Sequence, residues 1–242
     1  MADWSRGAPT PGRPPAVEIE GLARRFGMRW ALRGVDLRVE PGEAVALLGR
    51  NGSGKTTLLR VVATLLRPTR GRVRVAGRDV VREAAAVREH VGMMGHAPGL
   101  YDDLTAAENL RFAVRMMGRV VEEQRIAEAL AAVGLAAEAG ERVRGFSAGM
   151  RRRLVLARLR LQRPDVLLLD EPYASFDAEG VELLNAFVRE TVERGGAAVV
   201  ATHDLARGEG VLGRALVLEA GRLVEEMTVA RHSTPGREAV AP

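Results

Sequence analysis

The sequence predicts an α/β fold with a mixed β-sheet core, an antiparallel β-portion and a helical subdomain. Three observations lead to this prediction. An apolar run at 44–48 leads into a glycine-rich loop and a helix, a second apolar run at 166–170 ends in a carboxylate, and the stretch between them has helical periodicity. With 242 residues, 47% of them apolar, the chain is long enough for one large domain or one domain carrying an inserted subdomain.

The first elements are expected to follow a disordered tail. Residues 1–15 are rich in Pro, Gly and Arg and lack the apolar segment of a signal peptide. Apolar runs then predict strands over 17–22, 35–39 and 44–48, and a helix from 54 to about 66. The folded domain is expected to span 16–230. A second tail is expected over 231–242, where Ser, Thr, Pro and Gly gather.

The loop after the third strand is a phosphate-binding motif. The pattern G-x-x-x-x-G-K-[ST] is complete and ends in Gly54-Lys55-Thr56. Lys55 is the only lysine, and the other 35 of the 36 basic residues are arginine. A compact ammonium fits between two phosphates, whereas a guanidinium is a broad fork. We therefore expect a nucleoside triphosphate, bound by the loop and the start of its helix: Gly49, Arg50, Asn51, Gly52, Ser53, Gly54, Lys55, Thr56 and Thr57.

Helices are expected in the middle of the chain, in a subdomain over about 96–162 that follows a short strand near 91–94. Thr105 and Glu108 form a capping box that begins a helix ending near residue 117. Residues 126, 129, 130 and 133 are spaced for one face of a second helix. Residues 150, 154, 157 and 161 are spaced for one face of a third.

Two carboxylates follow the apolar run at 166–170. A buried parallel strand brings Asp170 to the sheet edge where the phosphate loop also lies. Asp170 and the Thr56 hydroxyl are oxygen ligands suited to Mg²⁺. Glu171 is placed to polarise a water molecule, which makes it the candidate general base. A helix over about 178–193 and strands near 197–202, 215–218 and 223–227 complete the domain.

Composition excludes several classes of protein. The net charge is +5, but the basic residues are interspersed with 31 acids, which does not favour nucleic-acid binding. The absence of cysteine excludes disulfides and thiolate metal sites. No run approaches the roughly 18 apolar residues of a membrane-spanning helix. We expect a cytoplasmic chain that reaches the inner face of the membrane through a partner.

Several motifs together resemble the ATP-binding cassette (ABC) ATPases. The 166–170 run resembles their Walker B strand, and Phe26 stands where the family places an aromatic residue that stacks on adenine. Three further segments resemble motifs of the family. The signature motif is matched by Phe146-Ser147-Ala148-Gly149-Met150, the D-loop by Ala174-Ser175-Phe176-Asp177, and the switch histidine by Thr202-His203-Asp204. The resemblance covers about 17–227. It implies the P-loop NTPase fold of the ABC ATPase type, with ATP and Mg²⁺ as cofactors.

The resemblance also implies a mechanism. Two cassettes, in a homodimer or heterodimer, would assemble head to tail, so that Ser147 and Gly149 of one contact the γ-phosphate held by Lys55 of the other. His203 would help to hold the attacking water, and Glu171 would activate it. Closure on ATP and reopening would drive integral membrane permease subunits.

Two departures from the family pattern point to a subgroup. His96 occupies the position of a usual glutamine, and since an imidazole can bind a metal it joins Thr56 and Asp170 as a candidate ligand. In the signature motif, Ala148 and Met150 replace the usual Gly and Gln. With the segments 95–105 and 146–153, these departures resemble the ATPase of the haem exporter used in cytochrome c maturation.

Other interpretations stay open. ATPases of drug, lipid or polysaccharide exporters have much the same motif sequences. A soluble ABC protein acting on ribosomes or DNA would usually carry two cassettes or a long coiled coil, and a regulator without catalysis would fit the presence of His96. The segment 142–163 holds eight arginines and no acid. These could form a solvated helix face, or Arg151–Arg153 could reach phosphate across a dimer or acids near the membrane.

Overall fold

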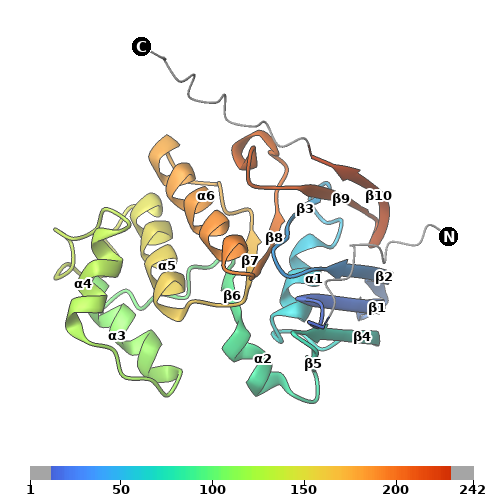
Figure 1. Ribbon diagram of the computed structural model, residues 1–242, viewed down its shortest axis with the longest axis horizontal. Helices are drawn as coiled ribbons and strands as arrows, with labels where there is room; N and C mark the ends of the chain where they lie inside the picture. Colours follow the sequence, from blue (N-terminus) through green and yellow to red (C-terminus); the bar gives the residue numbers. More distant parts are fainter. Residues whose placement is uncertain (1–11, 230–242) are drawn as a thin grey trace, which may run out of the picture.

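The computed structural model describes residues 12–229, so residues 1–11 and the whole of the predicted tail at 231–242 lie outside it (Figure 1). The strands are β1 (Val17–Phe26), β2 (Arg29–Val39), β3 (Ala44–Leu48), β4 (Arg70–Val75), β5 (Arg78–Asp79), β6 (Val91–Met94), β7 (Val166–Asp170), β8 (Ala197–Ala201), β9 (Arg214–Glu219) and β10 (Arg222–Thr228). The α-helices are α1 (Lys55–Val62), α2 (Ala84–His90), α3 (Ala106–Met116), α4 (Glu123–Ala131), α5 (Ala148–Gln162) and α6 (Ala178–Glu193).

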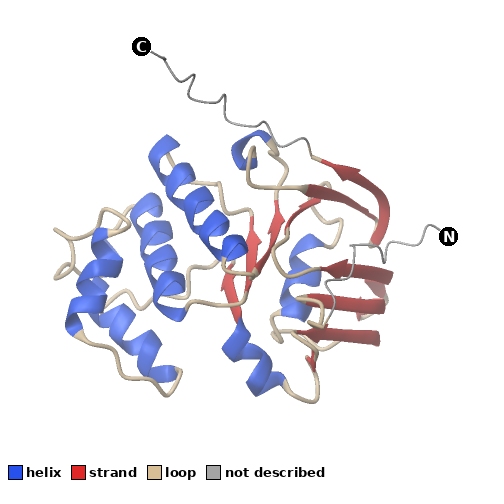
Figure 2. Ribbon diagram, viewed as in Figure 1, coloured by secondary structure: helices blue, strands red, loops and turns tan. Residues whose placement is uncertain are grey.

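The strands form two sheets. An antiparallel sheet has the order β2-β1-β4-β5, and a mixed sheet has the order β10-β9-β3-β8-β7-β6. The mixed sheet is parallel from β9 to β6, and only β10 runs antiparallel to its neighbour. Figure 2 shows the antiparallel strands on one side of the molecule and most helices on the other. The predicted fold class is confirmed.

Continuous apolar runs explain the centre of the mixed sheet. All residues of β7 and β8 are buried, as are four of the five in β3, because both faces of a parallel sheet are covered. Helix α1 packs between the two sheets, with Leu58 and Leu59 in one hydrophobic cluster with residues of β1, β3 and β8. Helices α5 and α6 cover the other face. The loop before α1 is thereby fixed at the carboxyl end of β3.

The antiparallel sheet extends further than the sequence indicated. β1 continues to Phe26 and β2 begins at Arg29, whereas only 17–22 and 35–39 were expected. The added residues pair across the β1–β2 hairpin and include several arginines, so they show no apolar run. Strands β4 and β5 and helix α2 were not predicted. α1 ends at Val62 instead of near 66, and Thr64 has a φ of +63° just beyond it.

Helices α3, α4 and α5 lie between β6 and β7 in the chain and gather away from the antiparallel sheet (Figure 1). The predicted capping box of α3 is confirmed, with the Glu108 amide donating to Thr105 Oγ1 and the Thr105 amide donating to Glu108 Oε2. Three side chains of α5, Arg152, Arg158 and Gln162, donate to backbone carbonyls within 91–99. These bonds fasten α5 to β6 and to the loop that follows it. Within residues 12–229, no helix is both long and apolar enough to cross a membrane.

Candidate active site

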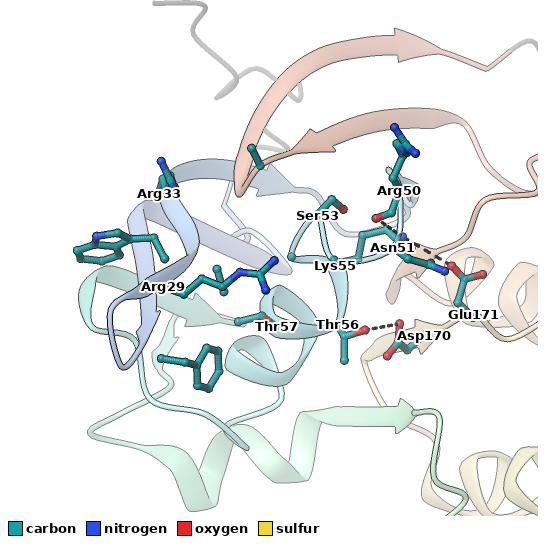
Figure 3. A pocket seen from close by; sticks show the side chains of 16 residues that line it. Arg29, Arg33, Arg50, Asn51, Ser53, Lys55, Thr56, Thr57, Asp170 and Glu171 are labelled. Carbon is teal, nitrogen blue, oxygen red and sulfur yellow. Dashed lines mark hydrogen bonds and ion pairs between the residues drawn. The ribbon is translucent and has the colours of Figure 1, made fainter.

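A cavity of 540 Å³ lies beside the phosphate loop, between β2 and the ends of the parallel strands (Figure 3). Most of the predicted phosphate-loop residues line it, together with Phe26, Asp170 and Glu171. The β2 wall was not predicted. The full lining is Phe26, Arg29, Trp30, Ala31, Arg33, Arg50, Asn51, Gly52, Ser53, Gly54, Lys55, Thr56, Thr57, Asp170, Glu171 and Ala220.

Lys55 begins α1, and its side chain turns back over the loop. Nζ donates to the Gly49 carbonyl oxygen at 2.6 Å and lies 3.7 Å from Glu171 Oε1. The residue is only 6% exposed. The loop backbone therefore fixes the ammonium group beside the carboxylate predicted to act as base.

Ser53 gives a test of whether a phosphate group fits this loop. Its Oγ is buried and has no hydrogen-bond partner among the described residues. An unpaired buried hydroxyl costs free energy, and a phosphate oxygen would remove that cost by accepting a hydrogen bond from it. Gly54 has a φ of +116° at the N-cap of α1, so the chain turns sharply and presents the helix N-terminus to the cavity. The loop fits a polyphosphate.

Replacing Gly49 should destabilise the fold. Gly49 has a φ of +145°, and a Cβ there would lie 2.2 Å from the Leu218 carbonyl oxygen. Strain and overlap together should lower the free energy of unfolding of Gly49→Ala by about 2–4 kcal/mol. Gly52 is the matched control, since it has a φ of +81° and nothing within 4 Å of the added Cβ. Urea denaturation measures both variants, and an equal loss of stability in Gly49→Ala and Gly52→Ala would contradict the argument.

Thr56 and Asp170 meet at the carboxyl end of β7. Thr56 Oγ1 donates to Asp170 Oδ1 at 3.1 Å, and Asp170 is 4% exposed (Figure 3). Two adjoining oxygen donors match the few protein ligands that Mg²⁺ takes when nucleotide phosphates and water supply the rest. The described residues contain no group of three or more His, Asp or Glu side chains that could hold a metal by themselves.

His96 lies outside the cavity that Thr56 and Asp170 line. His96 lines a separate cavity of 360 Å³ with Arg60, Pro98 and Arg158, and it is absent from the lining of the phosphate-loop cavity. The loop that carries it follows β6, the outermost strand of the mixed sheet and the immediate neighbour of β7, which ends in Asp170. As a candidate metal ligand, His96 stays a prediction.

Glu171 is held in a strained conformation between a histidine and a lysine. Its φ is +47°, a region that non-glycine residues avoid and that is found at functional sites. Its amide donates to the Ala201 carbonyl of the neighbouring strand at 2.8 Å. Oε2 lies 2.9 Å from Nδ1 of His203, while Oε1 faces Lys55. The carboxylate therefore connects the histidine to the lysine, and of the three only Lys55 and Glu171 line the cavity.

The signature segment lies away from the cavity of its own chain. Ser147 caps α5 by accepting a hydrogen bond from the Met150 amide at 3.2 Å. Gly149 is packed against Ser175, with its Cβ position 3.2 Å from the Ser175 carbonyl oxygen. Neither Ser147 nor Gly149 lines the phosphate-loop cavity. One chain thus has the loop and the signature segment on separate surfaces.

Arg151, Arg152 and Arg153 all have partners within the chain. Arg151 pairs with Asp102 at 2.5 Å, and Arg153 donates to both Asp177 and Glu179 at the start of α6. Arg152 is buried, and this burial lowers the pKa of its guanidinium although Asp170 opposes the shift. These arginines do not form a uniformly solvated helix face. Because each already has a partner within the chain, the structure gives no support to the alternative in which they contact phosphate across a dimer.

Arg29, Trp30, Ala31 and Arg33 on β2, with Ala220 in the β9–β10 turn, are lining residues that sequence reasoning missed. No motif marks them. The one available signal was their place beside Phe26, which pairs with Arg29 across the hairpin. The Arg24 guanidinium lies 4.6 Å from the centre of the Phe26 ring, a cation–π contact.

Comparisons with known proteins agree with this geometry. The family model described as ABC transporter matches residues 32–174. The cytochrome c biogenesis ATP-binding export protein CcmA of Xanthomonas campestris pv. campestris is 42% identical over 207 residues, covering 86% of this chain and 95% of the relative. The daunorubicin resistance ATP-binding protein DrrA3 of Streptomyces coeruleorubidus is 40% identical, covering 88% of this chain and 68% of the relative.

Solved structures give the same result. An ATP-binding subunit of an ABC transporter has a TM-score of 0.82 at 27% identity, covering 88% of this chain and 90% of that one. A dimeric ATP-binding cassette in a post-hydrolysis state, bound to ADP and Pi, has a TM-score of 0.80 at 25% identity, covering 88% and 98%. The cavity, its loop and these relatives together show that the chain belongs to the ABC transporter family, as an ATP-hydrolysing cassette subunit.

Proposed function

We propose that this cassette, over 16–230 with a helical subdomain at about 96–162, energises a membrane permease that exports haem for cytochrome c-type biogenesis. In this proposal it acts at the cytoplasmic face of the membrane, in a homodimer or heterodimer of cassettes. The carrying observation is the 42% identity to CcmA, which extends over 86% of this chain and 95% of that relative.

The proposed roles within the cavity follow from its geometry. The amides of 49–54 and the N-terminus of α1 bind phosphate oxygens, and Lys55 neutralises their charge. Phe26 packs on the base. Thr56 and Asp170 would hold Mg²⁺, which supplies further charge neutralisation when bound. Glu171 accepts a proton from the attacking water, and His203, 2.9 Å from it, holds the carboxylate and the water in place.

The second half of the site is proposed to come from another cassette. Ser147 and Gly149 lie outside their own cavity, so an N-terminus of α5 that is to meet a γ-phosphate must meet one held by a second copy or a related subunit. The dimeric relative bound to ADP and Pi supports this arrangement.

Drug export is the second candidate function, favoured by the 40% identity to DrrA3. Deleting the gene in its own organism separates the two. Haem export predicts loss of covalent haem from c-type cytochromes, detected by haem staining, with b-type haem unchanged. The wild-type gene should restore covalent haem. A Glu182→Gln gene should restore it too, because Glu182 is an exposed carboxylate on α6, whereas a Glu171→Gln gene should not. Normal c-type cytochromes with increased anthracycline sensitivity would replace haem export by drug export.

A further inference from the structure

The β2 wall of the cavity carries two guanidinium groups that the proposed roles leave unused. Arg29 and Arg33 both line the cavity. In Figure 3 the Arg29 side chain extends from β2 toward Thr57 and the phosphate loop, whereas Arg33 is directed away from them. Of these two arginines, only Arg29 is therefore directed toward the phosphate loop.

The Arg29 guanidinium has no protein partner among residues 12–229. None of the side-chain hydrogen bonds, ion pairs or ring contacts found there involves it, whereas nearby Arg24 donates to the Arg67 carbonyl oxygen at 3.0 Å and covers Phe26. A guanidinium has five N–H donors in a planar fork that matches phosphate oxygens. An exposed one that extends into a cavity is available to a ligand there.

The charge of the cavity favours such a contact. Its lining holds four cations, Arg29, Arg33, Arg50 and Lys55, against the carboxylates of Asp170 and Glu171. Lys55 already lies 3.7 Å from Glu171, so part of its charge is balanced within the protein. A second cation that has no such partner would add to the electrostatic attraction that binds a polyphosphate.

We propose that Arg29 is a second polyphosphate-binding cation, which contacts the nucleotide from the side of β2. Arg29 pairs with Phe26 across the hairpin, so its side chain begins at the end of the cavity assigned to the base and extends toward the phosphates. It thus meets the phosphates nearest the ribose, which ADP and ATP share. Arg29 contributes affinity for both nucleotides and has no part in water attack. This rests on nucleotide binding at the loop and is independent of the transported molecule.

Calorimetric titration of the full chain with ADP tests this directly, together with steady-state kinetics in ATP. For Arg29→Gln the Kd for ADP and the KM for ATP should each rise about tenfold, the loss expected for one charge-assisted hydrogen bond. The kcat should stay within about twofold of wild type, because the reacting groups are unchanged. The difference should shrink at high salt. Arg29→Lys should keep most of the affinity, since it retains the charge.

Two comparison variants sharpen the result. Arg78→Gln, on exposed β5 and paired with Glu83 at 3.8 Å, should bind ADP like wild type. Arg33→Gln, which removes a cation of the lining that is directed away from the loop, should lose clearly less affinity than Arg29→Gln. The proposal is overturned if Arg29→Gln binds ADP within twofold of wild type. It is also overturned if Arg33→Gln loses as much affinity as Arg29→Gln, because the effect would then come from the summed positive charge of the cavity and not from a direct contact. If Lys55→Ala also left ADP binding unchanged, the loop itself would not be the site, which is a separate failure.

Discussion

Lys55→Arg is expected to keep the fold and the charge but lose at least about a hundredfold in ATP turnover, as when one preorganised charge-stabilising group is removed. The reason is space. The ammonium lies 2.6 Å from the Gly49 carbonyl oxygen within the loop, and the residue is 6% exposed. A planar guanidinium is larger and directs its donors in a fixed fork, so it cannot occupy the same position without displacing the loop backbone.

Phosphate release measures the effect, and circular dichroism checks the fold. Arg60→Lys is a matched control because Arg60 is on the same helix, exposed, and outside the phosphate-loop cavity. It makes the reverse exchange between the same two residue types and should leave turnover unchanged. A fully active Lys55→Arg would contradict our explanation of why the single lysine of the chain stands at this position.

The parts of the fold that the sequence predicted well are those in which the signal is local. The strand, loop and helix at 44–62 and the acid-ending strand β7 carry their apolar pattern and their chemistry within a few residues. The contact of Thr56 with Asp170 followed from them, because parallel strands end at one edge of a sheet.

The missed parts depend on long-range pairing. The arginine-containing ends of β1 and β2 are strands because they pair with each other, so no apolar run marks Arg29 or Trp30 as lining residues. The place of His96 in a separate cavity depends on how the loop after β6 packs against α5, through Arg152 and Arg158. The strained φ of Glu171 and its contact with His203 likewise depend on the packing of β7 beside β8.

Glu171→Gln should remove turnover while retaining nucleotide. Loss of a general base costs about 10²–10⁴ in rate, and we expect about 10³. The amide keeps the size of the side chain, and glutamine bears the same backbone strain as glutamate at a φ of +47°, so the fold and the ATP affinity should change little. Glu182→Gln makes the same chemical change at an exposed position on α6, where Glu182 lies 3.5 Å from Arg189, and should be fully active.

The decisive measurement is multiple-turnover phosphate release at saturating ATP and Mg²⁺ by wild type and Glu171→Gln, with bound nucleotide determined in the same samples. We predict repeated turnover by wild type and less than about 1% of that rate by a Glu171→Gln variant that still binds ATP. Equal rates for the two proteins would contradict the assignment of Glu171 as the base and, with it, our account of how this cavity hydrolyses ATP.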